Sequence, residues 1–182
     1  MKIYKFKENA KLWMDLGFNV RLLKVEKLIG TRKLYRSSIS ITENNLNDGS
    51  IYNEYNFLAI QIKYGNLLCL DIDNVDNTIE NFHKLLDANG FTLDDFDYDI
   101  TLHDGYHIYF KNSMEVPRNF YGKVRKGIHY DILCKGNLFM PPSYFGEMEY
   151  KSTGKMSVIN DIEDLMDVPE FLIEYIMDME IN

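Results

Sequence analysis

The amino-acid sequence predicts an α+β protein whose main element is an antiparallel sheet. Short runs rich in β-branched and aromatic residues are separated by polar turns, which is typical of strands joined as hairpins. Helical segments do not alternate regularly with these runs, so a doubly wound parallel sheet is disfavoured. The first hairpin is expected to turn around Gly65 and Asn66. The strand pairs that we expect to form hairpins are 57–63 with 67–73, and 98–102 with 106–110.

The first element of the chain is predicted to be a short helix over residues 8–16 (ENAKLWMDL). Ala10, Trp13 and Met14 are spaced to lie on its inward side, because side chains three and four positions apart share a helix face. Gly17 follows directly and is suited to end the helix.

A second helix is predicted over residues 78–88 (TIENFHKLLDA). Asp76 or Asn77 can act as its N-cap, and Gly90 is placed to terminate it. The residues spaced for its inward face are Ile79, Phe82 and Leu86.

The remaining elements lie toward the C-terminus. A strand is predicted over residues 128–133 (IHYDIL). The next run, LFMPPS, is expected to stop at its two prolines, because proline cannot continue a central strand. Pro169 is suited to open a last helix, where its missing N–H costs nothing.

The size of the chain is suited to one domain. It has 182 residues, of which 46% are hydrophobic and 14% aromatic, enough for one compact unit or two small lobes that share a core. We expect a single domain over 1–182. Within it we expect an N-terminal αβ lobe over about 1–50, a core over about 51–160 and a C-terminal helix over about 161–180.

Cysteine content and hydropathy set the expected compartment. Cys69 and Cys134 are the two cysteines and form no CxxC pair, so we expect both to be buried, reduced and not bound to zinc. The N-terminus lacks the apolar stretch of a signal peptide, and no later segment reaches the roughly 18 apolar residues of a membrane span. We therefore expect a cytoplasmic protein without membrane association.

Charge is unevenly distributed along the chain. The net charge of -8 argues against nucleic acid, whose phosphates an acidic surface repels. Residues 21–36, however, hold six basic residues and one acid. Ordinary solvated segments account for such stretches equally well, so charge alone leaves the partner open. A second basic stretch contains Arg118, Lys123, Arg125 and Lys126.

Two acids stand at the end of the apolar run LLCLDID. Because side chains alternate along a strand, Asp71 and Asp73 share one face, while Leu70 and Ile72 share the other. Converging carboxylates repel unless one takes up a proton or a divalent cation joins them, and Mg²⁺ prefers such oxygen ligands. A metal site and a strand end with two solvated acids fit this pattern equally well.

The same alternation singles out residues on two further strands. In YHIYF, Ile108 and Phe110 take the apolar face and leave His107 on the other. In IHYDIL, His129 and Asp131 share one face. A third carboxylate and an imidazole on separate strands are what a metal and phosphate site requires. A packed core histidine is the alternative interpretation of His107.

Three ordered motifs resemble those of the archaeo-eukaryotic primase superfamily: LCLDID, then DGYHIYF, then GIHYDILCKGNLFMPPS. They are similar to the catalytic domain of its primase-polymerase type, found in plasmids, viruses and phages. In that family an hhDhD strand, a histidine after a small residue, and an hD strand leading to Pro-Pro-Ser follow in this order. The resemblance extends to the flanking stretches and covers nearly the whole chain. It implies an RRM-like antiparallel core flanked by helices, with a small N-terminal lobe.

The resemblance also implies an activity. It is that of a DNA primase or polymerase, which transfers nucleotides from nucleoside triphosphates under the direction of a single-stranded DNA template, with Mg²⁺ or Mn²⁺ as cofactor. A replicative helicase acting in trans is a further partner compatible with this activity. The implied catalytic and metal-binding residues are Asp71, Asp73 and Asp131. The residues implied in nucleotide binding are His107, Gly105, Lys135 and Ser143. A plain structural role fits Lys135 and Ser143 equally well.

Two other classes of function remain open from the sequence. A glycosyltransferase, or another enzyme acting on nucleotide diphosphates, also uses a DxD pair to hold a metal ion. A non-catalytic nucleic-acid-binding accessory of replication would keep the fold without turnover. Nucleotide-sugar turnover would identify the first, and DNA binding without nucleotide incorporation would identify the second.

Overall fold

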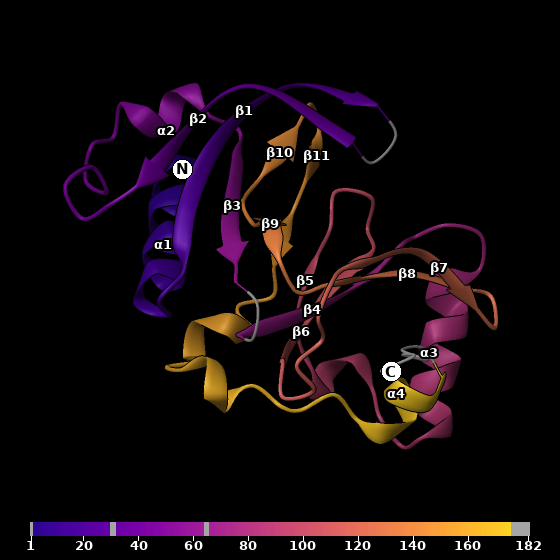
Figure 1. The fold of residues 1–182 in the computed structure, drawn as a ribbon. Helices are drawn as coiled ribbons and strands as arrows, with labels where there is room; N and C mark the ends of the chain where they lie inside the picture. The colour runs from indigo at the N-terminus through magenta and orange to yellow at the C-terminus, as the bar shows by residue number, and fades with distance from the viewer. Residues whose placement is uncertain (1, 30–31, 64–65, 176–182) are drawn as a thin grey trace.

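The computed structural model describes residues 2–29, 32–63 and 66–175 (Figure 1). Its helices are α1 (Lys2–Asp15), α2 (Ile51–Glu54), α3 (Thr78–Ala88) and α4 (Glu170–Tyr175), with 3-10 helices η1 (Leu93–Asp95), η2 (Lys155–Val158) and η3 (Ile162–Asp164). Its strands are β1 (Asn19–Ile29), β2 (Arg32–Ile41), β3 (Phe57–Ile62), β4 (Leu67–Ile72), β5 (Asp97–Ile100), β6 (Tyr106–Lys111), β7 (Phe120–Arg125), β8 (Ile128–Leu133), β9 (Gly136–Met140), β10 (Tyr144–Phe145), β11 (Met148–Glu149) and β12 (Lys151–Ser152).

The strands form two main sheets, and each of their pairings is antiparallel. The N-terminal sheet has the order β2-β1-β3-β9, and the central sheet has the order β12-β5-β6-β4-β8-β7. A small ribbon pairs β10 with β11. Figure 1 shows α1 beside the N-terminal sheet, and α3 and α4 on the side of the central sheet away from it. The predicted α+β class with a mainly antiparallel sheet is confirmed.

Helix α1 is longer than the predicted helix over residues 8–16. Phe6, Ala10 and Trp13 are buried, and this spacing continues the apolar stripe one turn toward the N-terminus. Met14 packs only partly against the same core. The helix ends where Gly17 adopts a φ of 86°, a conformation that glycine accepts without strain.

Helix α3 has the predicted bounds and covers one face of the central sheet. Phe82 and Leu86 are buried against Leu70 and Ile72 of β4, and Ile79 packs partly against the same cluster. Asn77 precedes the helix without a side-chain cap hydrogen bond, and Gly90 follows its end with a φ of 77°. Pro169 immediately precedes α4, as predicted.

One predicted hairpin is wrong. Strands β3 and β4 have nearly the predicted bounds, but β3 pairs with β1 and β9, whereas β4 pairs with β6 and β8. The predicted turn residue Gly65 lies outside the described residues. Both strands are buried on both faces, which suits a central position in a sheet. Each strand already has a partner on both of its edges, so the two cannot pair with each other.

The other strand predictions are confirmed. Strands β5 and β6 form an antiparallel hairpin, β8 covers residues 128–133, and β9 ends directly before Pro141. The basic tract over residues 21–36 forms most of the long β1–β2 pair, a region for which no hairpin was predicted. The part of the tract on β2 therefore lies at an edge of the N-terminal sheet.

The remaining expectations concern the cysteines, membrane-spanning helices and the division into lobes. Cys69 and Cys134 are buried and carry free thiols. In the described part of the chain, no helix has the length and apolar character needed to cross a membrane. The predicted division into lobes near residues 50 and 160 stays a prediction; the N-terminal sheet itself takes β3 and β9 from beyond residue 50.

The two main sheets meet through shared apolar clusters. Trp13 of α1 packs edge-on against Tyr109 of β6, with ring centroids 5.8 Å apart. A smaller cluster joins Leu23, Val25 and Phe57 of the N-terminal sheet to other residues that include Leu102 and Tyr150. These contacts fix the N-terminal sheet over the face of the central sheet that the helices leave uncovered.

Candidate functional site

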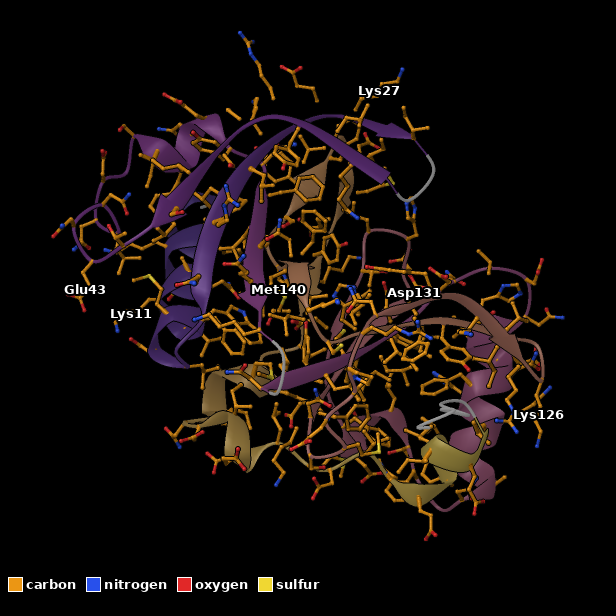
Figure 2. All side chains as sticks on the ribbon, viewed as in Figure 1. Lys11, Lys27, Glu43, Lys126, Asp131 and Met140 are labelled. Atoms are coloured by element: carbon orange, nitrogen blue, oxygen red, sulfur yellow. The ribbon has the colours of Figure 1, made fainter. Side chains whose placement is uncertain are left out.

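Three of the predicted site residues lie side by side across the central sheet. Strand β4 lies between β6 and β8, and in this register Asp71 is paired with His107 on one side and with Asp131 on the other. Their neighbours Leu70 and Ile72 face the helices. The row therefore lies on the face turned toward the N-terminal sheet, and Figure 2 labels Asp131 between β7–β8 and the β1–β2 hairpin.

His107 lies at one end of this row, beside Asp71, and is buried. The residue is 3% exposed, and its Nε2 atom is 3.4 Å from Oδ2 of Asp71. Its ring lies beside that of Tyr150, with centroids 5.6 Å apart. Among the described residues, Nδ1 of His107 has no hydrogen-bond partner. Because buried polar atoms are normally paired, this unpaired nitrogen is a reason to look for a ligand.

Asp73 follows the last residue of β4 and continues the pairing with β8. Its backbone N–H donates to the carbonyl oxygen of His129 at 3.1 Å. Burial raises the pKa of the Asp73 carboxyl to about 6, and the negative charges of Asp71 and Asp131 add to the rise. Asp71 and Asp131 are thus close enough to oppose the ionisation of Asp73.

Asp131 is oriented by a backbone group from the edge strand. Its Oδ1 atom accepts a hydrogen bond from the N–H of Gly122 at 2.6 Å. Burial raises the pKa of Asp131, and this hydrogen bond to the ionised form partly offsets the rise. The nearby charge of Asp71 raises it further.

The row forms one wall of a cleft between the sheets. The cleft has a volume of about 610 Å³ and includes Asp71, His107 and Asp131 in its lining, with Lys33 and Lys135 among the other lining residues. A smaller pocket of about 60 Å³ adjoins it. Asp71, Lys33 and Tyr150 line both hollows, and Asp73 lines the smaller one.

Lys33 brings a positive charge from the N-terminal sheet to the acids. Burial lowers the pKa of its amino group, and the negative charge of Asp71 opposes this effect. The Nζ atom lies 4.5 Å from the centroid of the Phe139 ring. The sequence placed Lys33 in a basic tract, but it did not distinguish this lysine from its neighbours, because the distinction depends on the pairing of distant strands.

Two of the predicted nucleotide-binding residues do not line either hollow. Ser143 is fully buried, and its hydroxyl accepts from the N–H of Leu58 at 2.8 Å and donates to the Leu58 carbonyl. Gly105 lies against the end of β4, where an added Cβ atom would be 2.2 Å from the carbonyl oxygen of Ile72. Packing alone accounts for the residue type at both positions, and their contact with a nucleotide stays a prediction.

Sequence reasoning missed three further cleft residues. Tyr150 lies in the stretch after the Pro-Pro-Ser turn, Asn119 directly precedes β7, and Tyr121 lies near the start of β7. A lone tyrosine or asparagine carries no periodic signal. The side chains become recognisable as cleft residues only when the strands are paired.

The donor set is suited to a divalent cation, although its atoms are not gathered around one point. In residues 2–29, 32–63 and 66–175, no three Asp, Glu, His or Cys side chains form a ready-made metal cluster. Asp71 and Asp131 are nevertheless paired on neighbouring strands, and Asp73 follows Asp71 two positions later. Burial and, secondarily, the charges of Asp71 and Asp131 raise the pKa of Asp73 to about 6, and a bound cation would favour its ionised form. Oxygen ligands of this type fit Mg²⁺ or Mn²⁺.

No family model matches the chain, and no curated protein matches it either.

Proposed function

We propose that this protein is a DNA primase or polymerase, which carries out template-directed nucleotidyl transfer in the replication of a plasmid, virus or mobile element. The observation that supports the proposal most directly is the register of the central sheet. It sets His107, Asp71 and Asp131 side by side on three neighbouring strands. The motifs that carry the resemblance to primase-polymerases are thus neighbours in space as well as ordered in sequence.

In this proposal Asp71, Asp73 and Asp131 hold the divalent ions. Bound Mg²⁺ or Mn²⁺ would lower the pKa of an attacking 3′-hydroxyl group and stabilise the charge on the leaving pyrophosphate. The Gly122 N–H group orients one oxygen of Asp131 and leaves its other oxygen for a ligand. The protein's own part is to hold the three carboxylates in fixed positions beside the cleft, where a bound cation would favour their ionised forms.

Positively charged and hydrogen-bonding groups nearby are suited to the triphosphate. His107 lines the cleft beside Asp71, where an imidazole N–H can donate to a phosphate oxygen. Lys33 and Lys135 line the same cleft from the N-terminal sheet and the β8–β9 turn, respectively. Amines at these positions would neutralise phosphate charge that the carboxylates alone would repel.

The proposal is tested by the paired substitutions Asp71→Asn and Asp73→Asn in one variant. We expect incorporation of nucleotides on a primed single-stranded template to fall below about one hundredth of the wild-type rate, with either Mg²⁺ or Mn²⁺. The matched control is Asp87→Asn, which removes an exposed carboxylate from α3. It should incorporate nucleotides as the wild type does.

The expected loss must not come from unfolding. Replacing two mutually repelling, partly buried acids by amides should leave the unfolding temperature unchanged or raise it. Incorporation by the folded double variant at the wild-type rate would refute the proposal. Template binding by the wild type without any incorporation would support a non-catalytic accessory instead, and turnover of a nucleotide sugar would support a glycosyltransferase.

A further inference from the structure

An aromatic ring stands exposed at the opening of the cleft. Tyr121 of β7 is 65% exposed, yet it lines the same cleft as Asp71 and Asp131. Single exposed apolar residues are common on proteins and need no explanation by themselves. Tyr121 is different because hydrogen bonds and backbone geometry hold it in one place.

Asn119 fixes the position of the Tyr121 hydroxyl. Its Nδ2 atom donates to the Tyr121 hydroxyl oxygen at 2.7 Å and to the carbonyl oxygen of Lys135 at 2.9 Å. Its Oδ1 atom accepts from the backbone N–H groups of Cys134 at 2.8 Å and Lys135 at 3.0 Å. Hydrogen bonds to Cys134 and Lys135 thus anchor Asn119 to the β8–β9 turn. Its hydrogen bond to the Tyr121 hydroxyl then restricts the motion of the tyrosine ring.

An irregularity in strand β7 orients the Tyr121 ring. The pairing of β7 with β8 shifts register between Phe120 and Lys123, so Tyr121 and Gly122 lie in a bulge. Gly122 has a φ of 61°, and its N–H donates to Asp131 at 2.6 Å. Bulges redirect side chains and occur often beside active sites. The same bulge therefore orients a proposed metal ligand and presents an aromatic face.

We propose that Tyr121 is a stacking platform for a nucleobase. This inference rests on the proposed function, because it assigns base binding to the part of the cleft that the phosphate-binding groups do not occupy. Lysines attract the phosphates of a nucleotide, and carboxylates attract its metal ions. The flat phenol ring is suited instead to stacking on the base. Every base has such a face, so the contact tolerates any sequence. The base belongs either to a nucleoside triphosphate or to a DNA strand.

The test compares three variants by equilibrium binding, without any need for turnover. Tyr121→Leu removes the ring, and Tyr121→Phe keeps the ring but loses the hydroxyl. Tyr35→Leu is the matched control, because Tyr35 is a second tyrosine that is 52% exposed and it lies on β2 outside the cleft lining. The strand probes are an oligothymidylate of about ten nucleotides and an abasic oligonucleotide of equal length. The nucleotide probes are ATP and inorganic tripolyphosphate, each with Mg²⁺.

We expect Tyr121→Leu to weaken binding of a base-containing probe by about tenfold or more, while its abasic or tripolyphosphate counterpart binds as before. Tyr121→Phe should weaken binding less than Tyr121→Leu does, because it keeps the ring and loses only the hydrogen bond from Asn119. Tyr35→Leu should bind within about twofold of the wild type. A loss confined to oligothymidylate assigns the platform to a strand, and a loss confined to ATP assigns it to the incoming nucleotide.

Several results would overturn the inference. One is that Tyr121→Leu binds both base-containing probes with wild-type affinity, and another is that it loses as much affinity for the probes without bases. The inference also fails if Tyr35→Leu loses as much affinity as Tyr121→Leu, or if the wild-type protein binds neither kind of probe. If the wild-type protein fails to incorporate nucleotides but its binding of bases depends on the Tyr121 ring, the proposed enzyme activity is refuted. The role of Tyr121 in stacking is then still supported.

Discussion

The charge of a single residue, Asp73, should make the stability of the protein depend on pH. Its pKa lies at about 6 in the folded protein, against an ordinary value of 3.8, chiefly because the carboxyl is buried and secondarily because Asp71 and Asp131 are close. Between these two values the folded chain keeps a proton that the unfolded chain releases. The free energy of unfolding therefore decreases as pH rises through this window.

We expect Asp73 to account for about 1 kcal/mol of this decrease, since the residue is partly exposed and solvent screens its interactions with charged neighbours. Urea unfolding of metal-free protein at several pH values measures it. Asp73→Asn cannot titrate and should show a smaller decrease than the wild type, while Asp87→Asn should keep the wild-type dependence. Identical pH profiles for wild type and Asp73→Asn would show that the carboxyl is not perturbed.

At the same scale, strand periodicity predicted which face of the run carries the apolar residues and which carries the acids. Alternation placed Asp71 and Asp73 on the face opposite Leu70 and Ile72, and the buried cluster beneath α3 confirms the apolar face. Lys33 and Tyr121 could not be predicted in this way. Their positions depend on the packing of one sheet over another and on a bulge, and neither feature has a local sequence pattern.

At the scale of elements, the turn between β5 and β6 is packed tightly against the end of β4. A Cβ atom on Gly105 would be 2.2 Å from the Ile72 carbonyl oxygen and 3.2 Å from the backbone nitrogen of Asn74. Backbone atoms of a central strand cannot move aside cheaply. Gly105→Ala should therefore lower the free energy of unfolding by about 1–3 kcal/mol.

Gly49→Ala is the matched control for this element. A Cβ atom at Gly49 would meet nothing within 4 Å, so its effect should stay within about 0.5 kcal/mol. Urea unfolding of the two variants and the wild type measures the difference. Equal stability of Gly105→Ala and Gly49→Ala would contradict the close approach of the turn to β4.

The predicted hairpin between β3 and β4 failed at this scale for a physical reason. Two adjacent β-rich runs favour local pairing, and the signal around Gly65 and Asn66 is a short-range one. Each run is apolar on both faces, which also suits the centre of a sheet. Separate central positions bury both strands more completely than one hairpin would.

At the scale of the whole molecule, the cleft exists because the N-terminal sheet lies over the open face of the central sheet. Lys33 is the basic residue that this arrangement brings beside Asp71. If the cleft binds nucleoside triphosphates as proposed, Lys33→Gln should raise the KM for the nucleotide about tenfold, because one phosphate contact is lost.

Lys27→Gln provides the comparison. Lys27 lies on β1 in the same basic tract but is exposed, and Figure 2 labels it near the top of the molecule, away from Asp131. Its substitution should leave the KM for the nucleotide within about twofold of the wild-type value. Equal effects of the two substitutions in steady-state kinetics would mean that net charge, and not the position of Lys33, assists binding.

The sequence by itself determined the α+β class, the approximate bounds of α3, β3–β6 and β8, and the faces of the strands that carry Asp71, Asp73, His107 and Asp131. These properties follow from local periodicity, caps and turn residues, which act over a few positions of the chain. Only the tertiary structure decided that β3 and β4 belong to different sheets and that Lys33 faces Asp71. It also decided that a bulge in β7 presents Tyr121 at the cleft. Such placements depend on burial and strand pairing between distant segments, where the gain from a shared core outweighs the local preference of any one segment.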